Sequence, residues 1–150
     1  IPGNNMISDG KKVTKDYSKL NTYEVVAKGS EVAIVALGTF LELGKEVAKL
    51  VEEKIGVKAT VINPVYITGI DKELLERLKE NHKAVLTLED GILDGGFGEK
   101  IARFYGNSNV NVINYGYEKK FLDRYDPNEI LKLNKLTKEQ IAEDIENLLN

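Results

Sequence analysis

From Thr22 onward, short apolar runs alternate along the chain with longer segments whose apolar residues recur at helical spacing. The runs EVAIVALG, KATVIN and KAVLTLE are rich in β-branched residues and have few polar interruptions. Runs of this kind are typical of strands that are buried on both faces of a parallel sheet. TYEVVAK and VNVINYG are two further strand candidates, one at each end of the series.

The segments between these runs carry the start and stop signals of helices. Residues 39–54 form an amphipathic pattern that ends at Gly56, and Asp71 is placed as the N-cap of DKELLERLKEN. A third helix is expected over residues 96–105. Two C-terminal helices are expected to begin at the N-cap signals Asp126-Pro127 and Thr137-x-x-Gln140.

Strands that alternate with helices predict an α/β fold, in which a mostly parallel sheet lies between two layers of helices. Residues 1–21 are polar and weakly periodic, so we expect a linker or N-terminal arm there and a single domain over 22–150. Ligands of such sheets usually bind beyond the carboxyl ends of the strands. Those ends carry Gly38-Thr39 and the loops NPVYITG, EDGILDGGFG and NYGYEKKF.

Composition excludes several classes of function. The net charge of −3 argues against a nucleic-acid or membrane-surface partner, and no apolar run approaches the length of a membrane span. The absence of cysteine and the single histidine exclude thiol catalysis, disulfides and a multi-histidine metal site. The chain begins IPGNN, with neither an initiator methionine nor a signal-peptide pattern, so we expect a cytoplasmic protein and an excised piece of a longer polypeptide.

The glycine loop at Gly95, Gly96 and Gly98 is the first candidate for chemistry, because glycine-rich turns between a strand and a helix often bind phosphate. However, Lys and Ser/Thr do not follow the glycines as a P-loop requires, and Ile101 stands where a dinucleotide fingerprint needs glycine. Four nearby carboxylates also disfavour an anion: Glu89, Asp90, Asp94 and Glu99. We therefore expect the glycines to supply positive φ angles and a close backbone approach, with Phe97 as an apolar plug against another domain or subunit.

Other candidate residues have simpler structural explanations. Glu89, Asp90 and Asp94 match no calcium-loop spacing, so we expect solvated acids and no metal site. His82 follows a helix end, where a histidine complements the C-terminal carbonyls without any catalytic role. Aromatic residues after the last strand are expected to pack against the C-terminal helices: Tyr115, Tyr117 and Phe121. We find no catalytic constellation in this sequence.

Two long stretches resemble the C-terminal domain of the transketolase family: VAIVALGTFLELGKEVAKLVEEKIGVKATVINPVYITGID and HKAVLTLEDGILDGGFGEKIARF. The shared features are a strand that ends in a small-residue and glycine turn, an acidic pair after a later strand, and GGFG. Within the family, the tail GYEKKFLDRYDPNEILKLNKLTKEQIAEDI is most similar to the deoxyxylulose-phosphate synthases. Pyruvate-dehydrogenase β-subunits and transketolases themselves share the first signature.

The resemblance implies a five-stranded sheet in which the strand near TYEVVAK is antiparallel at one edge and EVAIVAL lies between KATVIN and KAVLTLE. It also implies a parent enzyme that uses thiamine diphosphate and Mg²⁺, with cofactor and substrate residues in its other domains and none in this chain. The partners would be those domains and a second subunit. Candidates for the interface or crevice are Gly38, Thr39, Glu89, Asp90, Gly91, Ile92, Leu93, Gly95, Gly96, Phe97 and Gly98.

Three functions therefore remain open. The chain could be the non-catalytic C-terminal domain of such a transferase, which would be inactive alone. It could instead be a domain that docks a partner subunit, as in dehydrogenase β-subunits. Third, it could be a free-standing module that binds a small anion at the Gly38 and Gly95–Gly98 turns.

Overall fold

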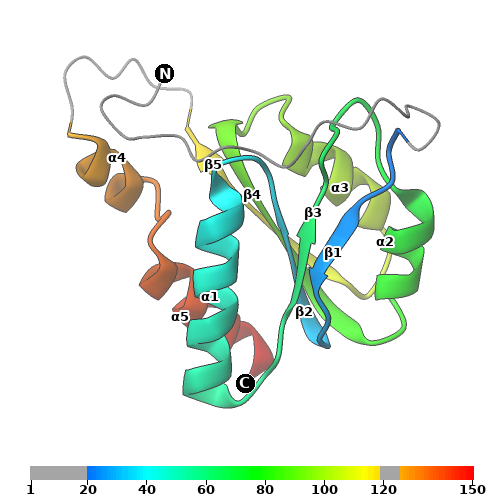
Figure 1. Cartoon of the computed structure of the whole chain (residues 1–150), viewed down its shortest axis with the longest axis horizontal. Coiled ribbons are helices and arrows are strands. Elements are labelled where there is room, and N and C mark those ends of the chain that lie inside the picture. Colours follow the sequence, from blue (N-terminus) through cyan, green and yellow to red (C-terminus); the bar gives the residue numbers. More distant parts are fainter. Residues whose placement is uncertain (1–19, 119–125) are drawn as a thin grey trace.

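The computed structural model describes residues 20–118 and 126–150, and these form a sheet between two helical layers. The strands are β1 (Glu24–Ala27), β2 (Glu31–Ala36), β3 (Thr60–Asn63), β4 (His82–Ile92) and β5 (Asn111–Tyr117). The helices are α1 (Phe40–Ile55), α2 (Lys72–Leu78), α3 (Phe97–Tyr105), α4 (Pro127–Leu133) and α5 (Lys138–Leu149). The expected α/β class is confirmed (Figure 1).

The strand order is β1-β3-β2-β4-β5. β2 pairs in parallel with β3 and β4, and β4 pairs in parallel with β5, whereas β1 is antiparallel to β3 at one edge. This is the order that the resemblance implied. The chain leaves β2 toward β3 on one side and later returns to β4 on the other, so the sheet has a switch point between the carboxyl ends of β2 and β4.

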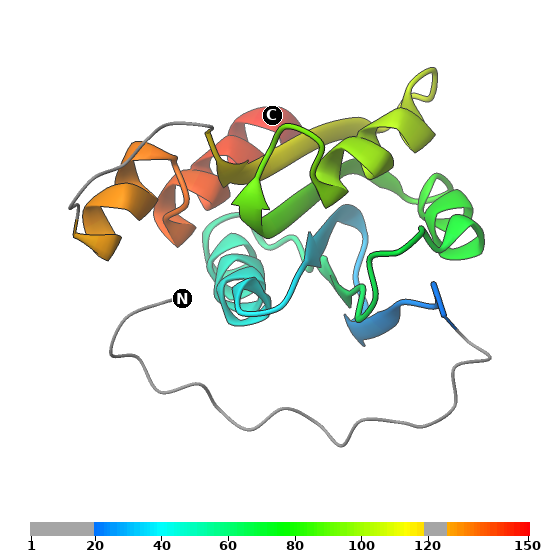
Figure 2. The same ribbon diagram turned by 90° about the horizontal axis from the view of Figure 1, so that it is seen from above.

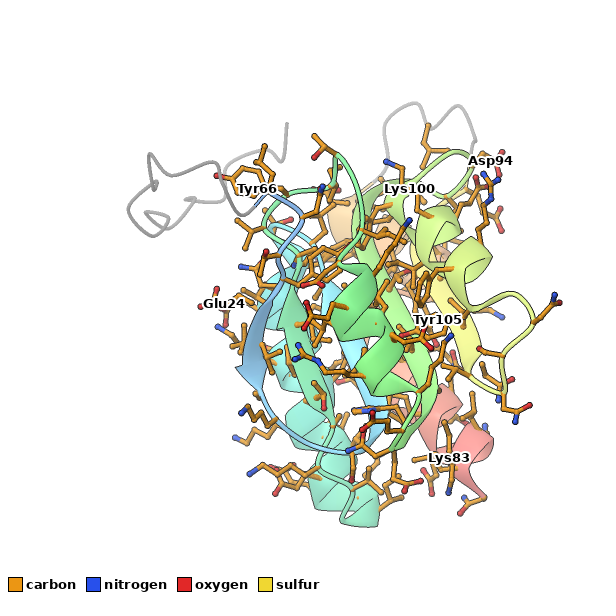
Figure 3. The ribbon with its side chains drawn as sticks, turned by 90° about the vertical axis from the view of Figure 1, so that its right-hand side faces the viewer. Glu24, Tyr66, Lys83, Asp94, Lys100 and Tyr105 are labelled. Carbon is orange, nitrogen blue, oxygen red and sulfur yellow. The ribbon has the colours of Figure 1, made fainter. Side chains whose placement is uncertain are left out.

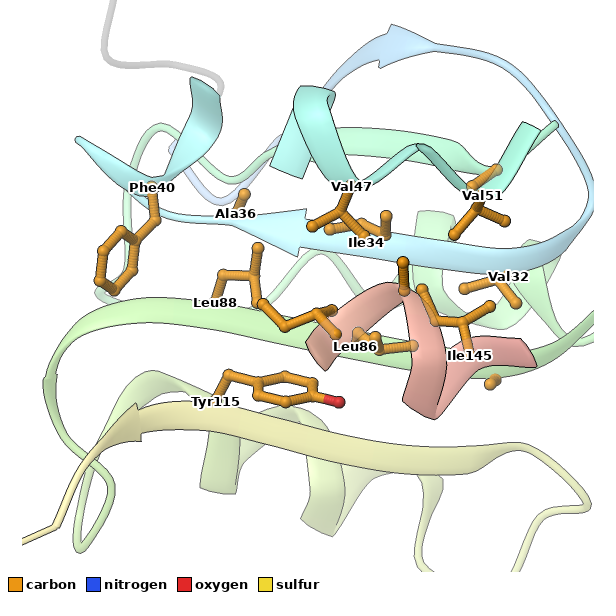
Figure 4. Close-up of a cluster of buried hydrophobic side chains, with 14 of the residues drawn as sticks. Val32, Ile34, Ala36, Phe40, Val47, Val51, Leu86, Leu88, Tyr115 and Ile145 are labelled. Atoms are coloured by element: carbon orange, nitrogen blue, oxygen red, sulfur yellow. The ribbon is translucent and has the colours of Figure 1, made fainter. Parts of the chain in front are cut away.

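Alternation along the central strands divides the core into two layers. Val32, Ile34 and Ala36 of β2 face α1 and α5, together with Ala84, Leu86 and Leu88 of β4; Figure 4 shows most of these side chains. Ala33 and Val35 face α2 and α3 on the opposite side. Figure 2 shows these helical layers on either side of the sheet. Because both faces are covered, every residue from Val32 to Ala36 is completely buried, as the continuous apolar run predicted.

Most helix boundaries lie where their sequence signals were found. Gly56 ends α1 in the left-handed conformation at φ 69°. The side chain of Asp71 accepts from the amide of Leu74, and that of Thr137 accepts from the amide of Gln140. The expected capping of α2 and α5 is therefore confirmed. The expected arm over residues 1–21 lies almost wholly outside the described residues, as does Phe121.

Within the part of the chain that the structure describes, no helix is both long enough and apolar enough to cross a membrane.

Candidate functional site

The residues expected to line a crevice or interface lie at the carboxyl edge of the sheet, where α1 and α3 begin. β4 is longer than the sequence predicted, because its pairing with β5 resumes at Ile92 and Tyr117 after an irregularity beyond Leu88. Glu89 and Asp90 therefore belong to the end of the strand and do not lie in the loop that follows it. Successive side chains of a strand point to opposite faces, so these two neighbouring carboxylates are directed to different helices.

Glu89 faces α3 and is only 4% exposed. Its carboxylate accepts hydrogen bonds from the backbone amides of Phe97 at 3.2 Å and Gly98 at 2.5 Å. These amides are in the first turn of α3, which has no capping side chain of its own. The expectation of a solvated loop acid was wrong for Glu89, because its side chain lies on the face of β4 that the N-terminus of α3 covers.

Asp90 faces α1 and is exposed. The hydroxyl of Thr39, the N-cap residue of α1, donates to the Asp90 carboxylate at 3.3 Å. The pKa of Tyr117 is raised, first because burial disfavours the phenolate and second because the charge of Asp90 lies beside it. Gly38 makes the turn before Thr39 with a φ of 58°. The structure thus brings Gly38, Thr39 and Asp90 together at the switch point, as the topology required.

The chain's own carboxylates are found at the N-terminus of each described helix that follows a strand. Asp71 caps α2, Asp126 caps α4 and Glu89 caps α3, while Asp90 lies beside the start of α1 and accepts from the Thr39 hydroxyl. An added phosphate at α3 would have to displace a buried carboxylate, and at α1 it would meet the charge of Asp90. This arrangement argues against the reading of a free-standing anion-binding module.

The three loop glycines serve three different purposes. Gly95 has a φ of 74°, and a Cβ atom there would meet open space. Glycine is therefore favoured at this position by the backbone conformation and not by a lack of room. Gly96 has an ordinary φ of −75°, but its Cβ would lie 2.1 Å from the Oε1 atom of Glu89. A Cβ on Gly98 would lie 2.6 Å from the hydroxyl of Thr87. The expected positive φ was wrong for Gly96 and Gly98, whereas the expected close approach was right for both, although it is made within the domain.

Phe97 is 4% exposed, so its expected role as an apolar plug against another domain or subunit was wrong. It is the first residue of α3 and lies on the stripe Phe97, Ile101, Tyr105 that faces the sheet. Its ring makes an edge contact with the buried ring of Tyr23, with 6.2 Å between centroids. The spacing of four residues along this stripe was visible in the sequence and was the signal that should have assigned Phe97 to the core.

Apolar exposure at the carboxyl edge lies elsewhere. Ile92 is 48% exposed, as expected, while Leu93 is half-buried. Val65 and Ile67, which sequence reasoning did not select, are 49% and 42% exposed in the loop after β3. Figure 3 shows Tyr66 of this loop at the same end of the domain as Asp94, with Lys83 at the opposite end. The uninterrupted apolar run Val65-Tyr66-Ile67 within the loop NPVYITG was the missed signal.

The backbone of the loop after β3 is also unusual. Val65 has a φ of 55°, a conformation that is strained for a β-branched residue. The amide of Tyr66 bonds the carbonyl of Pro64, which closes a tight turn around Val65. An exposed apolar side chain is therefore held in an unfavourable conformation at the edge where ligands or partners of such sheets bind.

At the opposite edge, His82 is buried as β4 begins. Its Nδ1 atom lies 3.1 Å from the carbonyl of Leu78 in the last turn of α2, and its Nε2 atom lies 2.8 Å from the hydroxyl of Thr60. The expected hydrogen bonding of His82 to a helix end is confirmed. Burial lowers the pKa of the imidazole.

Tyr115 and Tyr117 lie at the end of β5, and the expected packing against the C-terminal helices is confirmed for Tyr115, whereas the ring contact of Tyr117 is with α1. Tyr115 is buried, and its hydroxyl donates to Asp144 of α5 at 2.7 Å. Tyr117 lies beside Phe40 of α1, with 6.3 Å between ring centroids. Among the described residues, no group of three or more His, Asp or Glu side chains is placed to hold a metal ion.

Comparison with known proteins gives consistent matches. The family model "Transketolase, C-terminal domain" matches residues 21–141. The chain is 38% identical over 128 residues to the 1-deoxy-D-xylulose-5-phosphate synthase of Symbiobacterium thermophilum, covering 84% of this chain and 20% of that protein. The synthase of Clostridium tetani is 28% identical over 140 residues, covering 92% of this chain and 22% of that protein. The chain thus spans about a fifth of the length of these curated relatives.

Solved structures agree on the fold. A split-gene transketolase, described as an inactive β4 tetramer, matches with a TM-score of 0.77 and 26% identity over 87% of this chain and 43% of that one. A transketolase variant from Pichia stipitis matches with a TM-score of 0.59 and 19% identity over 85% of this chain and 18% of that one. The second likeness concerns the fold alone.

Proposed function

Because this chain belongs to the transketolase C-terminal domain family, we propose that it is the non-catalytic C-terminal domain of a thiamine-diphosphate-dependent 1-deoxy-D-xylulose-5-phosphate synthase. The parent enzyme would join pyruvate and glyceraldehyde 3-phosphate, with loss of CO₂, in the cytoplasm. The identity of 38% to one such synthase over most of this chain supports the synthase over other members of the family. The domain would comprise residues 22–150, with 1–21 as the linker from the preceding domain.

The residues at the carboxyl edge do not fit thiamine diphosphate. A diphosphate requires free amides and cations, often with a bound Mg²⁺, whereas this edge presents Asp90, Asp94 and the filled N-terminus of α3. One observation above all supports a non-catalytic domain: the carboxylate of Glu89 accepts from the first-turn amides of α3. These amides are therefore already occupied by a group of the chain itself and are not available to the diphosphate of a cofactor. Cofactor and Mg²⁺ would then be held by the other domains of the parent enzyme.

The domain would instead support assembly of the enzyme. Val65 and Ile67 in the loop after β3, and Ile92 at the end of β4, expose apolar side chains at one edge of the sheet. Exposed apolar side chains are typical of a contact with another domain or a second subunit. The earlier candidates Gly38, Thr39, Asp90 and Gly91 would line the same contact, whereas Glu89 and Phe97 would support it from inside the domain. In this proposal the parent enzyme is a dimer.

Titration calorimetry with thiamine diphosphate and Mg²⁺ tests the cofactor assignment. We expect no saturable heat from this chain alone, and a micromolar dissociation constant would contradict the proposal. In the parent enzyme, release of CO₂ from pyruvate should depend on glyceraldehyde 3-phosphate. Ketol transfer between sugar phosphates without CO₂ release would instead identify a transketolase, which the likeness to the split-gene transketolase makes the second candidate.

The assembly role has a separate test in the parent enzyme. Ile67→Asp combined with Ile92→Asp should lower the dimer fraction in sedimentation, because two exposed apolar contacts would become charged. The matched control is Val26→Asp combined with Leu133→Asp, since Val26 and Leu133 are exposed elsewhere on the domain. Equal loss of dimer in both variants would show that the carboxyl edge has no special part in assembly.

A further inference from the structure

An open depression of about 350 Å³ lies between the start of α2 and the outer face of α3. It is lined by Gly69, Ile70, Lys72, Lys100, Arg103 and Phe104. Three of these six residues carry a positive charge, on a chain whose net charge is −3. Figure 3 shows this side of the molecule, with Lys100 toward the carboxyl edge and α2 in front.

The cations that line this depression form no ion pair within the part of the domain that the structure describes. Among the residues that the structure describes, Lys72 and Arg103 have neither an ion pair nor a side-chain hydrogen bond. Lys100 donates from Nζ to the backbone carbonyl of Ile67 at 3.1 Å, which places the ammonium group without cancelling its charge. The two acids of α2 are engaged along their own helix, Glu73 with Arg77 and Glu76 with Lys79.

The floor of the depression is apolar and held in place. Ile70 and Phe104 are partly buried and pack on the core beneath α2 and α3. The ring of Phe104 makes an edge contact with Tyr105 at 5.1 Å, and the ammonium group of Lys79 lies 5.0 Å from its centroid. A fixed aromatic floor can accept an apolar side chain with little loss of its own conformational freedom.

We propose that this depression docks an acidic segment of a partner protein, which inserts one apolar side chain against Ile70 and Phe104 and presents carboxylates to Lys72 and Arg103. The depression is open, whereas pockets for small molecules enclose most of their ligand. Lys100 of the lining also bonds the backbone carbonyl of Ile67, whose side chain is exposed, so a bound segment that leaves the depression on this side would meet an apolar residue. A segment of chain uses such an extended surface better than a small anion does. This inference goes beyond the proposed function and does not depend on which reaction the parent enzyme performs.

The test is an NMR titration of the 150-residue chain. The probe is a synthetic peptide with a Leu-Phe pair flanked by glutamates. We expect shifts confined to the amides around residues 69–72 and 100–104. The variant Lys72→Glu/Arg103→Glu should weaken binding by about tenfold or more, because opposite charges become like charges. Both positions are exposed, and the dispersion of the spectrum reports whether the variant is folded.

Two controls make the result decisive. Lys49→Glu/Lys132→Glu changes the net charge equally at exposed positions of α1 and α4, and binding should be retained. A peptide with Gly-Gly in place of Leu-Phe should bind more weakly, because the apolar floor is then unused. The proposal is overturned if the control variant loses binding equally, if both peptides bind alike, or if the acidic peptide gives no saturable shift. It is also overturned if benzoate or inorganic phosphate at the same concentration reproduces the shifts, since the site would then be one for small anions.

Discussion

Where β4 begins, the Nδ1 atom of His82 is hydrogen-bonded to the carbonyl of Leu78 at the C-terminus of α2; near its other end, Glu89 accepts from the first-turn amides of α3. Both side chains are buried, at 7% and 4% exposure. Each complements the partial charge of the helix end that it meets, a donor at the C-terminus and a carboxylate at the N-terminus. Side chains of one strand thus cap the C-terminus of the preceding helix and the N-terminus of the following helix.

The two ends differ in charge and in what surrounds them. The Leu78 carbonyl can only accept, so Nδ1 of His82 carries the proton, and the hydroxyl of Thr60 donates to Nε2. This neutral arrangement agrees with the lowered pKa of His82. Around Glu89 there is so little space that Gly96 cannot carry a side chain. Titratable residues at the ends of central strands can thus be structural caps, although their position in the sequence makes them candidates for chemistry.

The largest disruption is expected from Gly96→Val. A Cβ atom at this position would lie 2.1 Å from the Oε1 atom of Glu89 and 2.8 Å from the carbonyl of Ile92. Overpacking and the displaced carboxylate together should lower the free energy of unfolding by about 2–4 kcal/mol, measured by urea denaturation. Gly95→Asn is the matched control, because its Cβ would meet open space and Asn tolerates a positive φ. If both variants lose the same stability, the close approach to Glu89 does not govern this loop.

The next effect is that of the capping carboxylate itself. Glu89→Ala leaves two amides at the start of α3 without their acceptor, and should cost about 2–3 kcal/mol of unfolding free energy. Glu89→Gln keeps one acceptor oxygen and nearly the same volume, but its NH2 group faces the second amide donor, so its cost should lie below that of Glu89→Ala without vanishing. Asp90→Ala, on the exposed side of the strand, should cost less than either. Equal losses for the alanine and glutamine variants would show that one accepted hydrogen bond does not stabilise the start of α3.

At the other end of β4, stability should depend on pH through His82. Its pKa is lowered from 6.5 in the folded chain, so below pH 6.5 the unfolded chain takes up a proton that the folded chain resists. The contribution of the neutral histidine is therefore present above pH 6.5 and is lost as the pH falls toward the folded-state pKa. The slope cannot exceed about 1.4 kcal/mol per pH unit for one proton.

Unfolding measured between pH 7.5 and 5.5 in wild type and His82→Gln isolates this effect, because the chain has no other histidine. The difference in stability between the two proteins should shrink as the pH falls. A constant difference across this range would show that the imidazole is not held neutral.

The smallest effect is expected from Asp94→Ala. Asp94 is exposed in the glycine loop, and no hydrogen bond or ion pair of its side chain is found among the described residues. Its removal should change the unfolding free energy by no more than about 0.5 kcal/mol. A loss comparable to that of Glu89→Ala would mean that the acids of this loop act together in capping α3. The buried Glu89 and the exposed Asp94 would then contribute equally to stability.

The sequence by itself determined the α/β class, the central strands and most helix ends of this protein, because these depend on local signals. The apolar run EVAIVALG, the stop at Gly56 and the caps at Asp71 and Thr137 are each contained in a few neighbouring residues. Only the tertiary structure decided the roles of Glu89, Gly96 and Phe97. The packing of α3 on one face of β4 places its first-turn amides over Glu89, and the strand continues to Ile92 because β5 offers a partner at Tyr117. A contact that depends on the packing of separate elements leaves no local pattern in the sequence. The sequence alone therefore allowed Glu89, Gly96 and Phe97 to be assigned to an interface, and only the packed strands and helices show that their contacts are made inside the domain.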